Sequence, residues 1–121
     1  MQKVFITNLS RPETLPVTAG FCSSFLQRLK GLMFHPPLSP QEGLLLVYGR
    51  DSRMDSSIHM LGVSTDLAVV WINNDNVVVD AILAKRGRLA YFPQKPARYV
   101  LEMAPERLAD FEIGDKILIK K

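Results

Sequence analysis

The chain has 121 residues and a formal net charge of +3, with 47% hydrophobic and 22% charged residues. This length supports a single domain over residues 1–121, and the composition is typical of a soluble globular protein. The charge is too low to require a nucleic-acid partner, no apolar run is long enough to span a membrane, and a single cysteine excludes an internal disulfide.

The N-terminal segment predicts a strand. "KVFITN" (3–8) is rich in β-branched and aromatic residues and is followed by turn-forming residues. The opening "MQKVFITNLSRPE" lacks the apolar core of about 7 to 15 residues that a secretory signal contains. We therefore expect a cytoplasmic protein.

The segment 18–30 is predicted to be the main helix. Its apolar residues recur at helical spacing, at Phe21, Phe25, Leu26 and Leu29. Thr18 is the expected N-cap, and Gly31 suits the position after the last turn. We expect this amphipathic helix to cover one end of a sheet.

The rest of the chain is predicted to consist mostly of short strands. A loop with three prolines occupies residues 35–43, and Pro105 begins a short turn or helix that continues to Phe111. The sequence "NDN" between two apolar runs predicts a tight hairpin turn. Strands are expected at 44–49, 57–61, 67–73, 77–85, 98–103 and 115–120.

Together these elements predict a mainly β (α+β) fold. Sequential strands without intervening helices argue against a doubly wound parallel sheet. We expect a single compact, antiparallel, β-rich and barrel-like domain with one main α-helix.

Five sequence blocks occur in an order and spacing that resemble a known family. They are "RLKGLMF" (28–34), "EGLLLVY" (42–48), "SIHML" (57–61), "DLAVVWINNDNVVVDAI" (66–82) and "ARYVLEMAPERLADFEIGDKI" (97–117). Their succession, over about residues 18–119, resembles the Domain of Unknown Function 192 family. The resemblance implies one compact β-rich fold and a bacterial-type protein, many of whose relatives are exported or membrane-anchored. It implies no activity, because the family is uncharacterised.

His59 is the centre of the site hypothesis, because it lies just before the longest apolar strand signal. We predict a non-enzymatic domain that binds a small ligand or a protein partner near His59, Met60, Arg50 and Arg53. The structural alternative is that His59 belongs to a half-buried strand and that backbone groups satisfy its ring nitrogens.

Two other functions remain open. A hydrolase or transferase could use Cys22, or a serine such as Ser56 or Ser57, with His59 as the base. In the predicted helix, Cys22 would lie in the first turn, where the dipole lowers a thiol pKa. Free cysteines are among the most buried residues, however, so the sequence favours a packing role for Cys22.

The second alternative is nucleic-acid binding through the basic segment 85–98. Its cations are interleaved with Tyr91 and Phe92, a pattern compatible with base stacking, or with a solvated loop that has no partner. We predict no cofactor. We also predict no metal site, because His35 and His59 lack the spacing of metal ligands.

Overall fold

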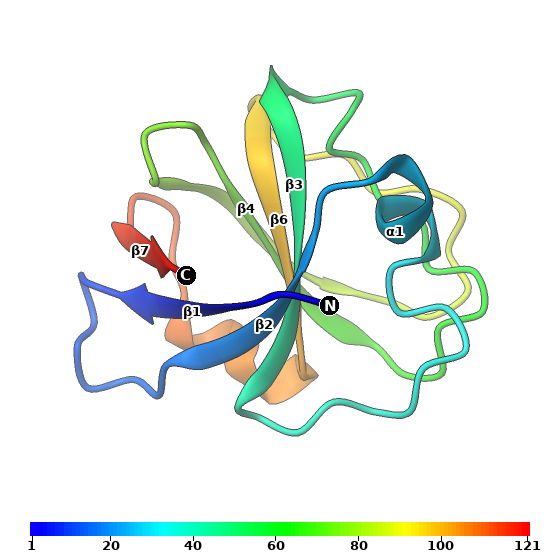
Figure 1. Cartoon of the computed structure of the whole chain (residues 1–121), viewed down its shortest axis with the longest axis horizontal. Helices are drawn as coiled ribbons and strands as arrows, with labels where there is room; N and C mark the ends of the chain where they lie inside the picture. Colours follow the sequence, from blue (N-terminus) through cyan, green and yellow to red (C-terminus); the bar gives the residue numbers. More distant parts are fainter.

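A strongly curled seven-stranded sheet forms the body of the protein in a computed structural model that describes all 121 residues (Figure 1). The strand order is β5-β4-β6-β3-β2-β1-β7. The elements are β1 (Lys3–Asn8), β2 (Val17–Cys22), α1 (Phe25–Lys30), β3 (Glu42–Ser52), β4 (Leu67–Ile72), β5 (Val78–Ala84), β6 (Ala97–Met103), the 3-10 helix η1 (Pro105–Asp110) and β7 (Ile117–Lys120). The predicted β-rich fold class is confirmed.

The predicted helix over 18–30 is wrong in its first half. Residues Val17–Cys22 form β2, which pairs with β1 on one side and with β3 on the other. Val17, Ala19 and Cys22 are buried by packing within the sheet. Hydrogen bonding along both edges and this burial favour a strand here, although the spacing of Phe21 and Phe25 is helical. The helix begins later, and its N-cap is Ser24 instead of Thr18.

Most of the other predicted elements are present, and one predicted strand is not. The hairpin of β4 and β5 is present, and Asn76 in its turn has a φ of +61°, a conformation that asparagine tolerates well. The turn or helix predicted after Pro105 is η1. The strand expected at 57–61 is reduced to one isolated bridge between Ile58 and Tyr91.

One strand pair departs from the antiparallel pattern. β2 and β3 are parallel, whereas every other neighbouring pair in the sheet is antiparallel. A parallel pair needs a crossover connection, and residues 23–41, which contain α1, supply it. This crossover lies on the same side of the sheet as the connections 53–66 and 85–96 (Figure 1).

The core lies on both faces of the curled sheet. One cluster includes Leu45, Val70 and Leu101, and the other includes Leu46, Trp71 and Val100. All six residues of β4 are buried, which explains its continuous apolar sequence. The second cluster faces the crossover, so the space between the sheet and α1 has an apolar base.

Candidate functional site

A cavity of about 480 Å³ lies between α1, the middle of β3 and the connection that follows β3. Leu46 and Ile58 form part of its apolar wall, and Tyr48, His59 and Glu102 contribute polar groups. Its volume is within the range of about 300 to 1,000 Å³ that is usual for small-molecule sites. The cavity is therefore the strongest candidate site in the molecule.

Glu102 is the most unusual residue of this cavity. It lies near the C-terminal end of β6, between Leu44 of β3 and Val69 of β4, and only 4% of the residue is exposed. Its Oε1 is buried and has no hydrogen-bond partner. Burial raises the pKa of Glu102 to about 7, because a low-dielectric surrounding disfavours the charged carboxylate.

The end of α1 lies directly over this carboxyl group. A Cβ at Gly31 would be 3.5 Å from Oε1 of Glu102 and 3.8 Å from the carbonyl oxygen of Arg28. Gly31 also has a φ of +47°, which favours glycine. The glycine thus ends the helix, and both oxygen acceptors lie on the side of Gly31 where a side chain would begin.

His59 lines the cavity and holds α1 against the following connection. The Leu61 N–H donates to Nδ1 of His59 (3.2 Å), and Nε2 lies 2.9 Å from the carbonyl oxygen of Leu29. Since Nδ1 accepts a hydrogen bond, the ring proton is on Nε2, which donates to Leu29. Both nitrogens of His59 are therefore engaged by the backbone.

Arg28 and Tyr48 form another part of the wall. The guanidinium carbon of Arg28 lies 4.7 Å from the centre of the Tyr48 ring, within the range of a cation–π contact. Nη1 of Arg28 also donates to the carbonyl oxygens of Ser23 and Val47. These contacts join α1 to β3 and keep the cation at the wall of the cavity.

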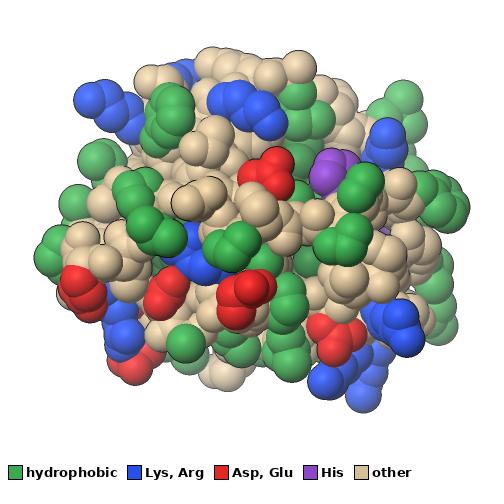
Figure 2. Space-filling model, turned by 90° about the horizontal axis from the view of Figure 1, so that it is seen from below, with side chains coloured by type: hydrophobic (Ala, Val, Ile, Leu, Met, Phe, Trp, Pro, Cys, Tyr) green, Lys and Arg blue, Asp and Glu red, His purple; other side chains and the backbone are tan.

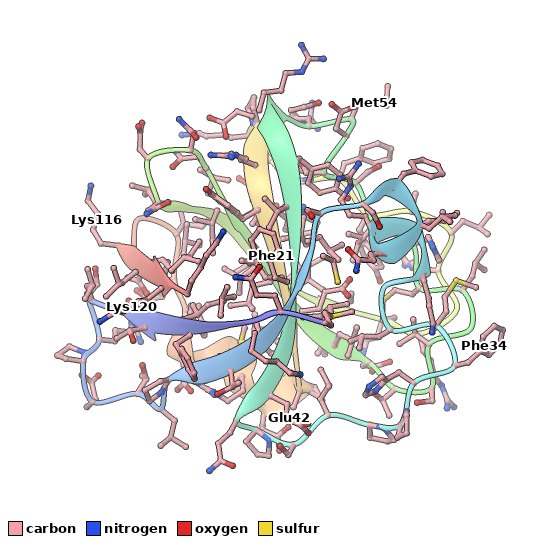
Figure 3. All side chains as sticks on the ribbon, in the orientation of Figure 1. Phe21, Phe34, Glu42, Met54, Lys116 and Lys120 are labelled. Carbon is pink, nitrogen blue, oxygen red and sulfur yellow. The ribbon has the colours of Figure 1, made fainter.

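The mouth of the cavity has an apolar rim on α1. Phe25 and Leu29 line the cavity although they are 69% and 50% exposed, and no residue of α1 is fully buried. Phe34 and Met54 project into solvent on the same side of the molecule (Figure 3). Of these four residues, Phe25 and Leu29 border the cavity itself.

The other residues of the predicted site lie outside the cavity lining. Met60 is fully buried in the core. Arg50 is largely exposed, and its Nε lies 3.8 Å from a carboxylate oxygen of Asp55, a residue of the cavity wall. Arg53 donates through Nε to the carbonyl oxygen of Pro93 (2.8 Å) and so links the connections 53–66 and 85–96.

Cys22 lies apart from His59, in a second depression that also borders Gly31. Burial raises the pKa of the Cys22 thiol to about 11, so the thiolate is scarce at neutral pH. The hydroxyl groups of Ser56 and Ser57 donate to the carbonyl oxygens of Ser52 and Met54. None of these three side chains is hydrogen-bonded to His59.

The basic residues of 85–98 make several contacts within the chain. Lys85 lies 3.4 Å from a carboxylate oxygen of Asp66, and Arg98 donates to the Tyr48 carbonyl and the Asn74 side chain. The Tyr91 hydroxyl accepts a hydrogen bond from the Lys85 N–H. On the face in Figure 2, positive and negative side chains are interspersed.

The chain brings no three His, Cys, Asp or Glu side chains together in a group that could hold a metal ion. No helix in it has the length and apolar character needed to cross a membrane.

Sequence reasoning missed Glu102, Arg28 and Tyr48 as members of the site. A signal for Glu102 is present, since this acid interrupts a strand whose neighbours Leu101 and Met103 are apolar. An acidic residue between apolar strand residues is rarely buried without a partner, so a buried acid at such a position is a candidate for function.

The curled sheet and the crossover above its lateral cavity define a small β-rich protein of one domain. Residues 7–119 match the model of the DUF192 family, which is described as "Uncharacterized ACR". The chain belongs to this family.

Curated relatives come from archaea. A UPF0127 protein of Pyrococcus horikoshii is 33% identical over 115 residues, which cover 93% of this chain and 96% of the relative. A UPF0127 protein of Pyrococcus furiosus is 28% identical over 113 residues, covering 91% and 93%. Both support the family resemblance seen in the five sequence blocks.

Two crystal structures share the fold, each with a TM-score of 0.81 and 21% identity. One is a protein of unknown function from Novosphingobium aromaticivorans, with 96% of this chain and 83% of that chain aligned. The other is described as a putative transcription regulator from Sinorhizobium meliloti, with 97% and 92% aligned. At this identity the likeness extends to the fold alone.

Proposed function

We propose that this protein is a non-enzymatic binding domain whose small-molecule ligand occupies the cavity beneath α1. The observation that carries the proposal is the unpartnered carboxyl group of Glu102 in a cavity of about 480 Å³. Buried polar groups in folded proteins are nearly always paired. A ligand group that forms a hydrogen bond with Glu102 would supply the missing partner. His59 belongs to this site as a wall residue.

Binding without chemistry fits the state of the candidate nucleophiles. A general base needs a free nitrogen within reach of a proton to abstract, and both nitrogens of His59 are engaged by backbone groups. The raised thiol pKa of Cys22 and its separate location also argue against a role as the nucleophile. These features favour recognition over the hydrolase or transferase alternative.

A screen of small molecules by two-dimensional NMR tests the proposal. Ligands of the cavity should shift the amide signals of Arg28, Tyr48 and His59 and leave those of β7 unchanged, because β7 lies at the far edge of the sheet. Leu29→Trp places a larger ring at the mouth and should weaken binding at least about threefold by steric exclusion.

Leu26→Trp is the matched control, since Leu26 is an exposed leucine of the same helix that does not line the cavity. It should leave the affinity unchanged. Equal effects of the two substitutions, or ligand-induced shifts confined to other parts of the chain, would contradict the proposed location.

A further inference from the structure

The carboxyl group of Glu102 also indicates which kind of ligand the cavity accepts. Its Oε1 has no donor in the protein, and no ion pair involves this residue. An ionised carboxylate can only accept hydrogen bonds. The missing partner is therefore a donor, and a positively charged donor compensates the buried charge best.

The other charged groups of the cavity have partners within the chain or lie at its edge. Arg28 is bound to two carbonyl oxygens and stacks on Tyr48, and Lys30 is exposed on the last turn of α1. Asp55 is about half exposed at the rim. Glu102 is thus the only charged group of this cavity that is both buried and without a partner.

A second acceptor lies beside Glu102. The carbonyl oxygen of Arg28, near the end of α1, is 3.8 Å from the empty Cβ position of Gly31, and Oε1 is 3.5 Å from the same point. Cations are favoured near the carbonyl end of a helix. Both oxygens therefore lie on the same side of Gly31, and a group with several N–H donors can serve two neighbouring acceptors.

We propose that the cavity binds small organic cations, in which a primary ammonium group donates to Glu102 and a compact apolar body lies against Leu46 and Ile58. This inference rests on the proposed function and specifies the ligand class of the same site. Wall residues from three elements surround the ligand: Leu29 of α1, Leu46 and Tyr48 of β3, and Ile58 and His59 of the following connection.

Three probes with one ring and different head groups test the ligand class: benzylamine, benzyl alcohol and benzoate. Titrations followed by NMR should give the highest affinity for benzylamine. Glu102→Gln should lower the benzylamine affinity by about tenfold or more, the size expected for a lost charge-assisted hydrogen bond. The same substitution should change the affinity for benzyl alcohol less than about threefold.

Glu106→Gln is the matched control, because it makes the same substitution at an exposed glutamate outside the cavity. It should change the benzylamine affinity less than about threefold, since exposed charges are screened by solvent. Comparable losses in the two variants would overturn Glu102 as the specific partner.

The pH dependence is an independent readout. Benzylamine affinity should rise from pH 6 to pH 8 as Glu102 loses its proton, and should stay flat in Glu102→Gln. The titratable or charged groups nearest this carboxyl are Arg28 and Lys30 of α1, Tyr48 of β3, Cys22 of β2, and Asp55 and His59 of the connection. They are the same in the wild type and in Glu102→Gln, so a difference between the two profiles reports Glu102.

The outcomes separate this inference from the proposed function. If benzoate binds more tightly than benzylamine, or if Glu102→Gln has no effect while Leu29→Trp still weakens binding, the ligand class is wrong and the cavity remains the binding site. If none of the three probes shifts a signal of the cavity wall, both are overturned.

Discussion

The buried carboxyl group of Glu102 links the stability of the protein to pH. The ordinary pKa of a glutamate is 4.5, and burial raises the pKa of Glu102 to about 7. Between these values the folded state binds more protons than the unfolded state, so stability falls as the pH rises. The contribution is complete below about pH 4.5 and is lost once the pH passes about 7.

Glu102→Gln should therefore gain stability relative to the wild type as the pH increases. The difference in free energy of unfolding between variant and wild type should grow by about 3 kcal/mol from pH 4 to pH 8, at about 1.4 kcal/mol per unit of pKa difference. Urea unfolding at pH 4, 6 and 8 measures it. A difference that stays constant with pH would show that the carboxyl group is solvated.

At the residue scale, part of the site was accessible from the sequence. His59 does line the cavity, and the expectation that backbone groups satisfy its ring nitrogens is met by Leu29 and Leu61. The partners themselves could not be predicted, because Leu29 is 30 residues away in sequence and reaches His59 only through the position of α1. Met60 follows strand-like burial and packs in the core.

At the scale of elements, α1 is held by its ends and by side-chain contacts more than by packing. Ser24 accepts a hydrogen bond from the Gln27 N–H, and the Gln27 side chain accepts from the Ser24 N–H, which is a capping box. No residue of α1 is fully buried. A six-residue helix is too short to be stable alone. The capping box and the side-chain contacts therefore determine whether α1 stays folded over the cavity.

Ser24→Ala should destabilise α1 locally by about 1 kcal/mol, the usual cost of a lost N-cap. Because little of the core depends on α1, the global free energy of unfolding should change less than about 0.5 kcal/mol. Amide hydrogen exchange should show faster exchange at Arg28 and Gly31 and unchanged exchange in β4. Ser23→Ala, at an exposed neighbour outside the cap, is the control.

The capping box is also the signal that would have corrected the helix prediction. "SSFLQ" contains Ser24 and Gln27 at the spacing typical of a helix start. The spacing of Phe21, Phe25 and Leu29 is also helical, so it moved the predicted start of the helix to a position before Ser24. Phe21 in fact belongs to β2. The β4–β5 hairpin was predictable because its turn and its two apolar runs are adjacent in sequence.

Sheet order was not predictable from local patterns. The neighbours β3 and β6 are separated by about 50 residues, and only the folded core brings them together. The parallel pairing of β2 with β3 was equally hidden, since the crossover between them contains a single short helix instead of the long one that usually marks such a connection.

At the scale of the whole molecule, the buried Arg107 joins three distant segments. Its guanidinium group donates to the carboxylate of Asp110 and to the carbonyl oxygens of Leu15 and Pro40. Only 3% of the residue is exposed. One guanidinium group is thus hydrogen-bonded to η1, to the loop after β1 and to the end of the crossover.

Arg107→Met should lower the free energy of unfolding by about 3 kcal/mol, because it leaves Asp110 and two carbonyl oxygens without their donor. Chemical denaturation measures the loss. Glu106→Gln, an exposed position on the same turn, should cost less than about 0.5 kcal/mol. A small effect of Arg107→Met would mean that water replaces the guanidinium at all three acceptors.

The parallel pairing of β2 and β3 determines which part of the chain covers the cavity and therefore where a ligand would enter. The chain must cross back over the side of the sheet before β3 begins. This return path, residues 23–41, covers the cavity above Glu102. His59 and Arg28 attach the return path to the connection 53–66 and to β3, and α1 itself adds no strand to the sheet. We therefore expect the entry and release of a ligand to disturb these contacts and to leave the strand pairing of the sheet intact.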